Sequence, residues 1–180
     1  MDTLTLDTNV LRDWCWVEGK VLEKRYNDDP NKREILKTLF SKLTKLRDDG
    51  NCEIGITNQI FTDFEKDWNE LPTFISEMIG SHVSYALPSI STFPMMFPFV
   101  FLDEGEVFSI LNDVFPSAKP EHKKYHSYKK DALQLYAHKA ASRDVFLTSD
   151  EKILLSREVL SSKWKIKVMT LDEYINSKVL

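Results

Sequence analysis

The chain has 180 residues, of which 42% are hydrophobic and 12% aromatic, and its 24 basic and 28 acidic side chains give a formal net charge of −4. This composition predicts one globular domain over residues 1–180 and excludes a disordered or fibrous protein, because eleven Phe, six Tyr and four Trp supply core material. No stretch approaches the roughly 20 apolar residues of a membrane span, and the acidic start is unlike a signal peptide. We therefore expect no membrane partner and a cytoplasmic location. The two cysteines, Cys15 and Cys52, are too few for a disulfide framework.

The first half of the chain alternates short β-prone runs with amphipathic segments. Apolar residues recur at three-and-four spacing between Ile35 and Leu46, which predicts a helix that ends before Gly50. Thr57 or Asn58 can cap a second helix. In chain order, the predicted elements are a strand over 3–6, a helix over 32–49, a strand over 52–56, a helix that ends or kinks at Pro72, and an irregular apolar connection over 81–102.

The second half continues the same alternation. Its predicted elements are helices over 104–114 and 129–142, a strand over 144–147, a helix over 151–160, a strand over 165–169 and a last helix from Leu171 or Asp172. Strands that alternate with helices form parallel sheets covered on both faces, with right-handed crossovers. The sequence therefore predicts an α/β protein, specifically a three-layer α/β/α sandwich.

Three carboxylates belong to segments that meet at one edge of such a sheet. Asp7 follows the first strand, Asp150 follows the strand over 144–147, and Asp131 is expected to open the helix before that strand, where the helix N-terminus favours its charge. Taken singly, Asp7 could also cap a following helix. Together the three acids would repel unless a cation lay between them, and oxygen ligands select Mg²⁺ or Mn²⁺.

Four segments resemble the PIN-domain family, metal-dependent nucleases that include many toxin ribonucleases. They are LTLDTNVL at 4–11, IGITNQIFTD at 54–63, DAL at 131–133 and DVFLTSD at 144–150. The resemblance covers most of the chain. It implies a parallel sheet of four to five strands, an acidic cluster that binds Mg²⁺ or Mn²⁺, and hydrolysis of RNA, single-stranded RNA being the expected substrate. The candidate protein partners are a cognate antitoxin or a second copy of the chain.

Carried over residue by residue, the resemblance makes Asp7, Asp131 and Asp150 catalytic acids that ligate the metal. Four neighbouring polar residues would hydrogen-bond the ligating carboxylates or a metal-bound water: Thr8, Asn9, Thr148 and Ser149. The two hydroxyls beside Asp150 are not nucleophile candidates, because no His or Lys accompanies them in a triad motif.

The family's second acid has three candidates here. On a helical wheel that starts at Ile60, Asp63 and Asp67 fall on one shoulder of the apolar stripe, and Glu65 falls on the other. Asp63 is closest to the strand exit. We therefore predict Asp63 as the fourth catalytic acid, with Asp67 as the next choice.

A basic run precedes Asp131. Residues 119–130 contain five lysines against Glu121 alone, in a segment whose proline and lysines indicate a loop. The run is either a solvated loop or a patch that binds the phosphates of RNA without reading sequence. The lysines predicted to bind RNA are Lys123, Lys124, Lys129 and Lys130.

Several alternatives stay open beside the nuclease. A domain of the same shape without catalysis would serve as an RNA-binding or protein-interaction module. Haloacid-dehalogenase-like phosphatases need a second Asp where this chain has Asn9, so that class fits poorly. His122 and His126 have helical metal-pair spacing but lack the accompanying Glu, and His138 is expected to be a packing or substrate-side residue rather than a catalyst. The apolar run 93–101 is either buried core or a docking surface for a second copy or an inhibitory partner.

Overall fold

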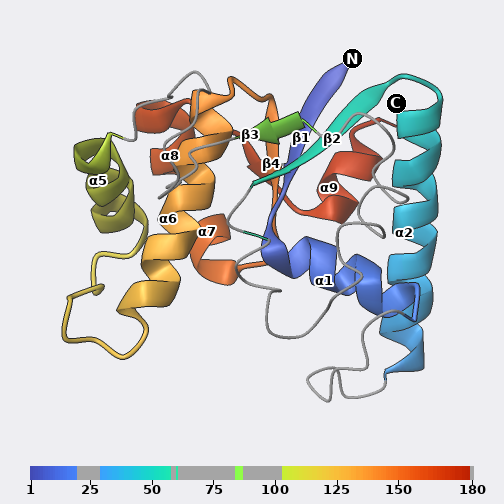
Figure 1. Cartoon of the computed structure of the whole chain (residues 1–180). Coiled ribbons are helices and arrows are strands. Elements are labelled where there is room, and N and C mark those ends of the chain that lie inside the picture. The colour runs from blue at the N-terminus through green and yellow to red at the C-terminus, as the bar shows by residue number, and fades with distance from the viewer. Residues whose placement is uncertain (20–28, 58–59, 61–83, 87–102, 179–180) are drawn as a thin grey trace, which may run out of the picture.

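The computed structural model describes residues 1–19, 29–57, 60, 84–86 and 103–178. Five strands form one sheet in the order β3-β2-β1-β4-β5, and every neighbouring pair is parallel (Figure 1). The strands are β1 (Asp2–Leu6), β2 (Cys52–Thr57), β3 (Ser84–Ala86), β4 (Val145–Leu147) and β5 (Val168–Met169). The predicted α/β class and parallel sheet are thus confirmed.

Helices lie on both faces of this sheet (Figure 1). One core joins Leu4 and Leu6 to α1 (Thr8–Val17), α2 (Pro30–Asp48) and α9 (Leu171–Asn176). The other core joins Phe146 and Val168 to α5 (Glu104–Val114), α6 (Tyr125–Ala140) and α8 (Arg157–Trp164). A short helix, α7 (Glu151–Leu155), follows β4. The arrangement is compatible with a three-layer sandwich, and its strands direct their carboxyl ends to one edge.

Local sequence explains several of the helix ends. α2 starts with Pro30 after the capping side chain of Asp29, which accepts from the N–H groups of Asn31 and Lys32. The chain leaves α2 through Gly50, whose φ of +71° suits glycine. α9 begins with a capping box in which Thr170 and Glu173 bond each other's backbone N–H groups.

The structure corrects five expected elements. α1 has no counterpart in the prediction, and α6 begins at Tyr125 rather than at residue 129. The single helix expected over 151–160 is two helices, α7 and α8, and β5 has two residues rather than five. β3 lies inside the stretch predicted to be irregular.

Other predictions fall outside the described residues. These include the three competing second acids, Asp63, Glu65 and Asp67, and the apolar run 93–101. Among the helices that the structure describes, none is long and apolar enough to cross a membrane.

Candidate functional site at the carboxyl ends of β1 and β4

Asp7 lies where β1 passes into α1. Its backbone N–H donates to the carbonyl of Leu147 at 2.9 Å, so the main chain is fixed to the end of β4. The residue is only 3% exposed. A carboxylate is therefore held in the interior at the sheet edge where parallel α/β proteins bind their ligands.

The charge of Asp7 is poorly compensated. Burial, together with the nearby negative charge of Asp150, raises the pKa of its carboxyl to about 6, although hydrogen bonds from Thr148 and from the backbone of Thr8 and Asn9 act in the opposite direction. Desolvation and like charge both disfavour ionisation, so the site would gain free energy from a cation.

Thr148 connects the two acids. This residue is fully buried, its hydroxyl donates to Asp7 Oδ2 at 2.6 Å, and its Oγ1 accepts the Asp150 N–H at 3.0 Å. Asp150 in turn caps α7, since its Oδ1 accepts the N–H of Lys152 at 2.8 Å. One threonine thus fixes the Asp7 carboxylate relative to the start of α7.

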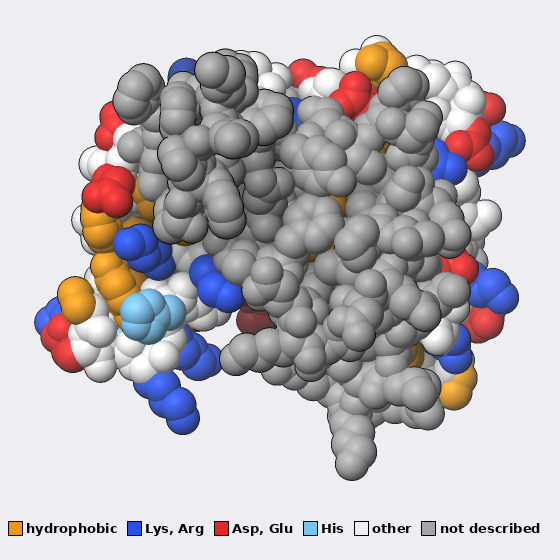
Figure 2. All heavy atoms as spheres, viewed as in Figure 1, with side chains coloured by type: hydrophobic (Ala, Val, Ile, Leu, Met, Phe, Trp, Pro, Cys, Tyr) orange, Lys and Arg blue, Asp and Glu red, His pale blue; other side chains and the backbone are white. Residues whose placement is uncertain are grey.

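A cavity of about 510 Å³ lies over these residues. The predicted acids Asp7, Asp131 and Asp150 all line it, and Arg12 and Lys130 add cationic side chains. The remaining lining residues are Thr8, Asn9, His126 and Ser127. Figure 2 shows basic side chains beside a hollow in which an acidic side chain lies recessed. Anionic and cationic groups in one cavity suit a ligand that combines a metal ion with a phosphate.

Asp131 reaches this cavity in a different way from that predicted. α6 begins six residues earlier, at Tyr125, so Asp131 lies in the second turn and does not open the helix. The expected stabilisation by the helix N-terminus is therefore wrong, because that effect fades after the first turn. Asp131 is half-buried and lies on the face of α6 that lines the cavity.

The donor chemistry fits a hard divalent cation. In the described ranges, no three His, Cys, Asp or Glu side chains lie together as a group that could hold a metal ion. Mg²⁺ usually keeps several waters and needs only one or two protein carboxylates. The buried Asp7 carboxylate and its charged neighbour Asp150 meet that lower requirement.

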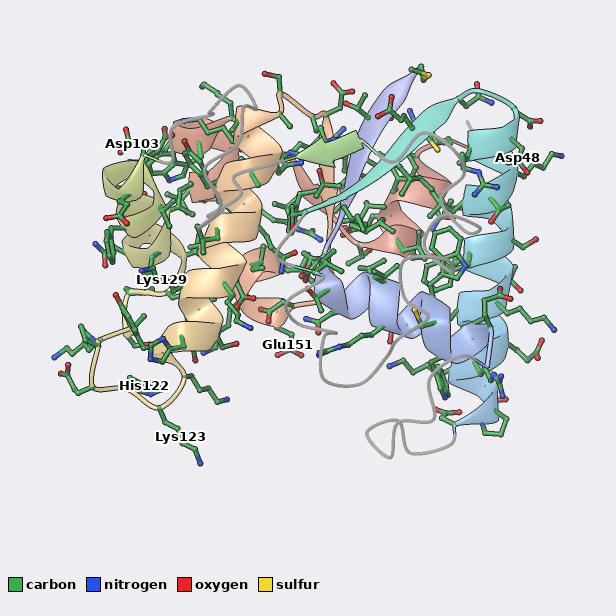
Figure 3. The ribbon with its side chains drawn as sticks, viewed as in Figure 1. Asp48, Asp103, His122, Lys123, Lys129 and Glu151 are labelled. Atoms are coloured by element: carbon green, nitrogen blue, oxygen red, sulfur yellow. The ribbon has the colours of Figure 1, made fainter. Side chains whose placement is uncertain are left out.

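The four predicted RNA-binding lysines divide into two pairs. Lys130 lines the acidic cavity, and Lys124 lines an adjoining cavity of about 850 Å³, together with Asn9 and Ser149. The side chain of Lys123 points away from α6 at the lower left of Figure 3. Lys129 Nζ lies 5.2 Å from the ring centroid of Phe108. The basic run is not one loop, because its last residues belong to α6.

Sequence reasoning did not assign four polar residues to this site, although it weighed His126 as one of a possible metal pair. Arg12, His126 and Ser127 line the acidic cavity. Gln134 donates a hydrogen bond to Thr8, which also lines it. Helical spacing would have found two of them: Arg12 lies four residues after Thr8, and Ser127 four residues before Asp131. That signal needed the true bounds of α1 and α6.

His138 is buried away from both cavities. It is 1% exposed, and its Nδ1 lies 2.9 Å from Thr5 Oγ1. Its ring also stands edge-on to Phe146, with 5.6 Å between the centroids. Burial lowers the pKa of His138 to about 4, so the ring is neutral at pH 7. These contacts give the residue a packing role.

Comparison with known proteins adds no relative to this description. No protein-family model matches the chain, and no curated protein matches it. The fold and the site define an α/β protein with an acidic cavity at the carboxyl edge of a parallel sheet.

Proposed function

We propose that the protein is a metal-dependent nuclease of PIN-like architecture that hydrolyses phosphodiester bonds, most readily in single-stranded RNA. The observation that carries this proposal is the cavity in which buried Asp7 lies with Asp131 and Asp150, flanked by Arg12 and Lys130. A cytoplasmic location and an RNA substrate belong to the same proposal, and a cognate antitoxin or a second copy of the chain are its candidate partners.

The acids hold the divalent ion in this proposal. Asp7 and Asp150 are the primary ligands, and Asp131 contributes from α6. A bound Mg²⁺ or Mn²⁺ supplies Lewis acidity, which favours attack of water on phosphorus and offsets charge on the departing oxygen. Above pH 6 most Asp7 carboxyls are ionised and able to ligate, because the pKa of this group is about 6.

The other residues bind and orient. Thr148 orients the Asp7 carboxylate through a 2.6 Å hydrogen bond to Oδ2, and the backbone N–H groups of Thr8 and Asn9 also bond this carboxylate. Arg12 and Lys130 face the same cavity and would hold the scissile phosphate, and Lys124 would hold a flanking phosphate from the adjoining cavity. Contacts of this kind supply affinity without sequence preference.

Cleavage assays test the proposal directly. The purified chain should cut single-stranded RNA in Mg²⁺ or Mn²⁺ and stop in EDTA, and Asp7→Asn or Asp150→Asn should lower kcat by orders of magnitude without unfolding the protein. A panel that includes DNA substrates identifies the preferred nucleic acid. Full activity in both variants would refute the assignment.

The lysine pairs provide a matched comparison. Changing Lys124 and Lys130 to Gln should weaken RNA binding and flatten its salt dependence by up to about 0.7 log units per lost contact. Changing Lys123 and Lys129 to Gln removes the same charge outside the two cavities and should have a smaller effect. Equal effects would show that the lysines act only through net charge.

A second candidate function is a non-catalytic module of the same shape. It is favoured by the lack, among the described side chains, of three acids or other ligands close enough to hold a metal together. Such a module would bind RNA or a protein without any response to Mn²⁺. Binding with no cleavage and no Mn²⁺ effect would select this function.

A further inference from the structure

The face of α6 toward the sheet carries a polar stripe that packing alone does not explain. Asp131, Gln134 and His138 are spaced three and four residues apart and so share one side of the helix. The stripe continues inward from the cavity, since Gln134 and His138 are each 1% exposed. Both polar side chains therefore lie between α6 and the sheet.

Each of these buried side chains contacts the segment that carries Asp7. Gln134 Nε2 donates to Thr8 Oγ1 at 3.0 Å, and His138 Nδ1 lies 2.9 Å from Thr5 Oγ1. Thr5 comes two residues before Asp7, and Thr8 directly follows it. The two contacts thus join α6 to this segment on both sides of the acid.

These contacts are a costly way to pack a helix. Within the described part of the chain, Gln134 Oε1 and His138 Nε2 are buried without a hydrogen-bond partner. Leaving a buried polar atom unsatisfied costs at least as much free energy as one typical hydrogen bond contributes. A leucine at position 134 would bury its surface without that cost, so stability does not account for the amide.

The contact of Gln134 with Thr8 fixes the position of α6 beside Asp7. A shift of the helix by one turn moves its residues by about 5.4 Å, and this contact would then be lost. Asp131 lies about 4.5 Å along the axis from Gln134, toward the cavity. The register set by Gln134 therefore determines how far Asp131 lies from Asp7.

We propose that Gln134 is a positioning residue of the acidic site, which holds Asp131 at the Asp7 side of the cavity through its hydrogen bond to Thr8. This inference rests on the proposed metal-dependent function. In this inference, Gln134 contacts neither substrate nor metal. It acts by setting the distance between Asp131 and Asp7.

The test compares Gln134→Met, which keeps the length of the side chain, with Thr5→Val, which removes the other buried contact away from the cavities. Thr5→Val should lower Tm by a few degrees, and Gln134→Met should change Tm less, because it also removes the unpartnered amide oxygen. Gln134→Met should also raise the Kd for Mn²⁺, measured by calorimetry without RNA, by about 10- to 100-fold and lower kcat similarly, with KM for RNA nearly unchanged. Thr5→Val should leave the Mn²⁺ affinity within about twofold of wild type.

A double-mutant cycle assigns the effect to the contact. Thr8→Val and Gln134→Met should each weaken Mn²⁺ binding, and the double variant should be no weaker than the worse single one. If Gln134→Met binds Mn²⁺ and cleaves RNA like Thr5→Val, the positioning role is refuted and the nuclease stands. If the wild type binds Mn²⁺ without cleaving and Gln134→Met weakens that binding, the positioning role stands and the nuclease falls. A wild type that neither binds Mn²⁺ nor cleaves refutes both.

Discussion

Replacing Asp7 with Asn should make the metal-free protein more stable at neutral pH, even though it removes a residue of the proposed site. Burial and the charge of Asp150 raise the Asp7 pKa from 3.8 to about 6. Multiplied by about 1.4 kcal/mol per pH unit, this difference is about 3 kcal/mol. The residue is 3% exposed, so solvent screening removes little of it.

The direction follows from proton binding. The folded protein holds the Asp7 proton more tightly than the unfolded chain, so the wild type loses this stability as the pH rises from about 4 through about 6. The asparagine side chain would not titrate, and Thr148 could still donate to its amide oxygen. The advantage of Asp7→Asn should therefore be absent near pH 4 and approach about 3 kcal/mol at pH 7, about 6–12 °C in Tm for a domain of this size.

Urea unfolding in EDTA at several pH values between 4 and 7.5 measures this difference. The matched control is Glu151→Gln, which removes one negative charge from an exposed side chain in the first turn of α7 (Figure 3). Its stability should differ from wild type by less than about 0.5 kcal/mol at every pH. If the curves for Asp7→Asn and wild type are parallel, ionisation of the buried carboxylate does not destabilise the fold.

Three further variants test residues at the carboxyl end of β4 and in β2. Asp150→Asn keeps a capping side chain but removes the repelling charge, so calorimetry should show a higher Tm in EDTA and a smaller rise in Tm with Mn²⁺; the opposite changes would contradict a shared cation site. Thr148→Val should cost about 2–3 kcal/mol in urea unfolding, because Asp7 loses its hydrogen bond, and NMR titration should find the Asp7 pKa higher still, not lower. Gly55→Ala should cost about 2–4 kcal/mol, because its Cβ would lie 2.5 Å from Cζ of the buried Arg143; a loss under about 0.5 kcal/mol would show that this guanidinium moves freely.

The parallel sheet could be predicted because its strands carry a local signal. The run over 3–6 is apolar or β-branched and lies between Asp2 and Asp7, and the apolar run over 145–147 directly follows Asp144. α5 has the bounds that its sequence indicates, 104–114, and Asp103 caps it through the N–H of Glu106. In these segments, local preference and tertiary structure agree.

The prediction missed helix α1, although its sequence carries a helical period. Thr8, Asn9, Arg12 and Asp13 recur at three-and-four spacing beside the buried apolar residues of the helix. The helix is stabilised by distant contacts, among them the stacking of Trp14 on Phe40 of α2 at 4.9 Å between ring centroids.

The start of α6 also escaped prediction. Pro120 and the lysines around it indicate a loop, yet the helix already begins at Tyr125. Tyr128 is buried there and stacks on Phe115, with 4.6 Å between the ring centroids. A tertiary contact thus outweighs local composition, and it adds about one turn of helix before residue 129.

The acids of the site could be predicted, whereas their surroundings could not. Topology alone directs Asp7 and Asp150 to one edge of a parallel sheet. The cationic side of the cavity depends on Arg12 and Lys130, which lie on helices whose bounds were missing or wrong. The depth of burial that raises the pKa of Asp7 is a property of packing, which no local pattern records.

The polar layer under α6 connects stability with function. Strands buried in the middle of a parallel sheet are usually apolar on both faces, but here Thr5 of β1 and Thr57 of β2 are buried, and Thr5 contacts His138 of α6. Thr57 is 1% exposed, and its hydroxyl has no hydrogen-bond partner within the described residues, although register places it beside Asp7. Thr5 contacts His138 of α6, whereas the hydroxyl that bonds the Asp7 carboxylate is that of Thr148, at the end of β4. Direct support for a charge at position 7 therefore comes from β4, and the polar side chains under α6 fix that helix against β1.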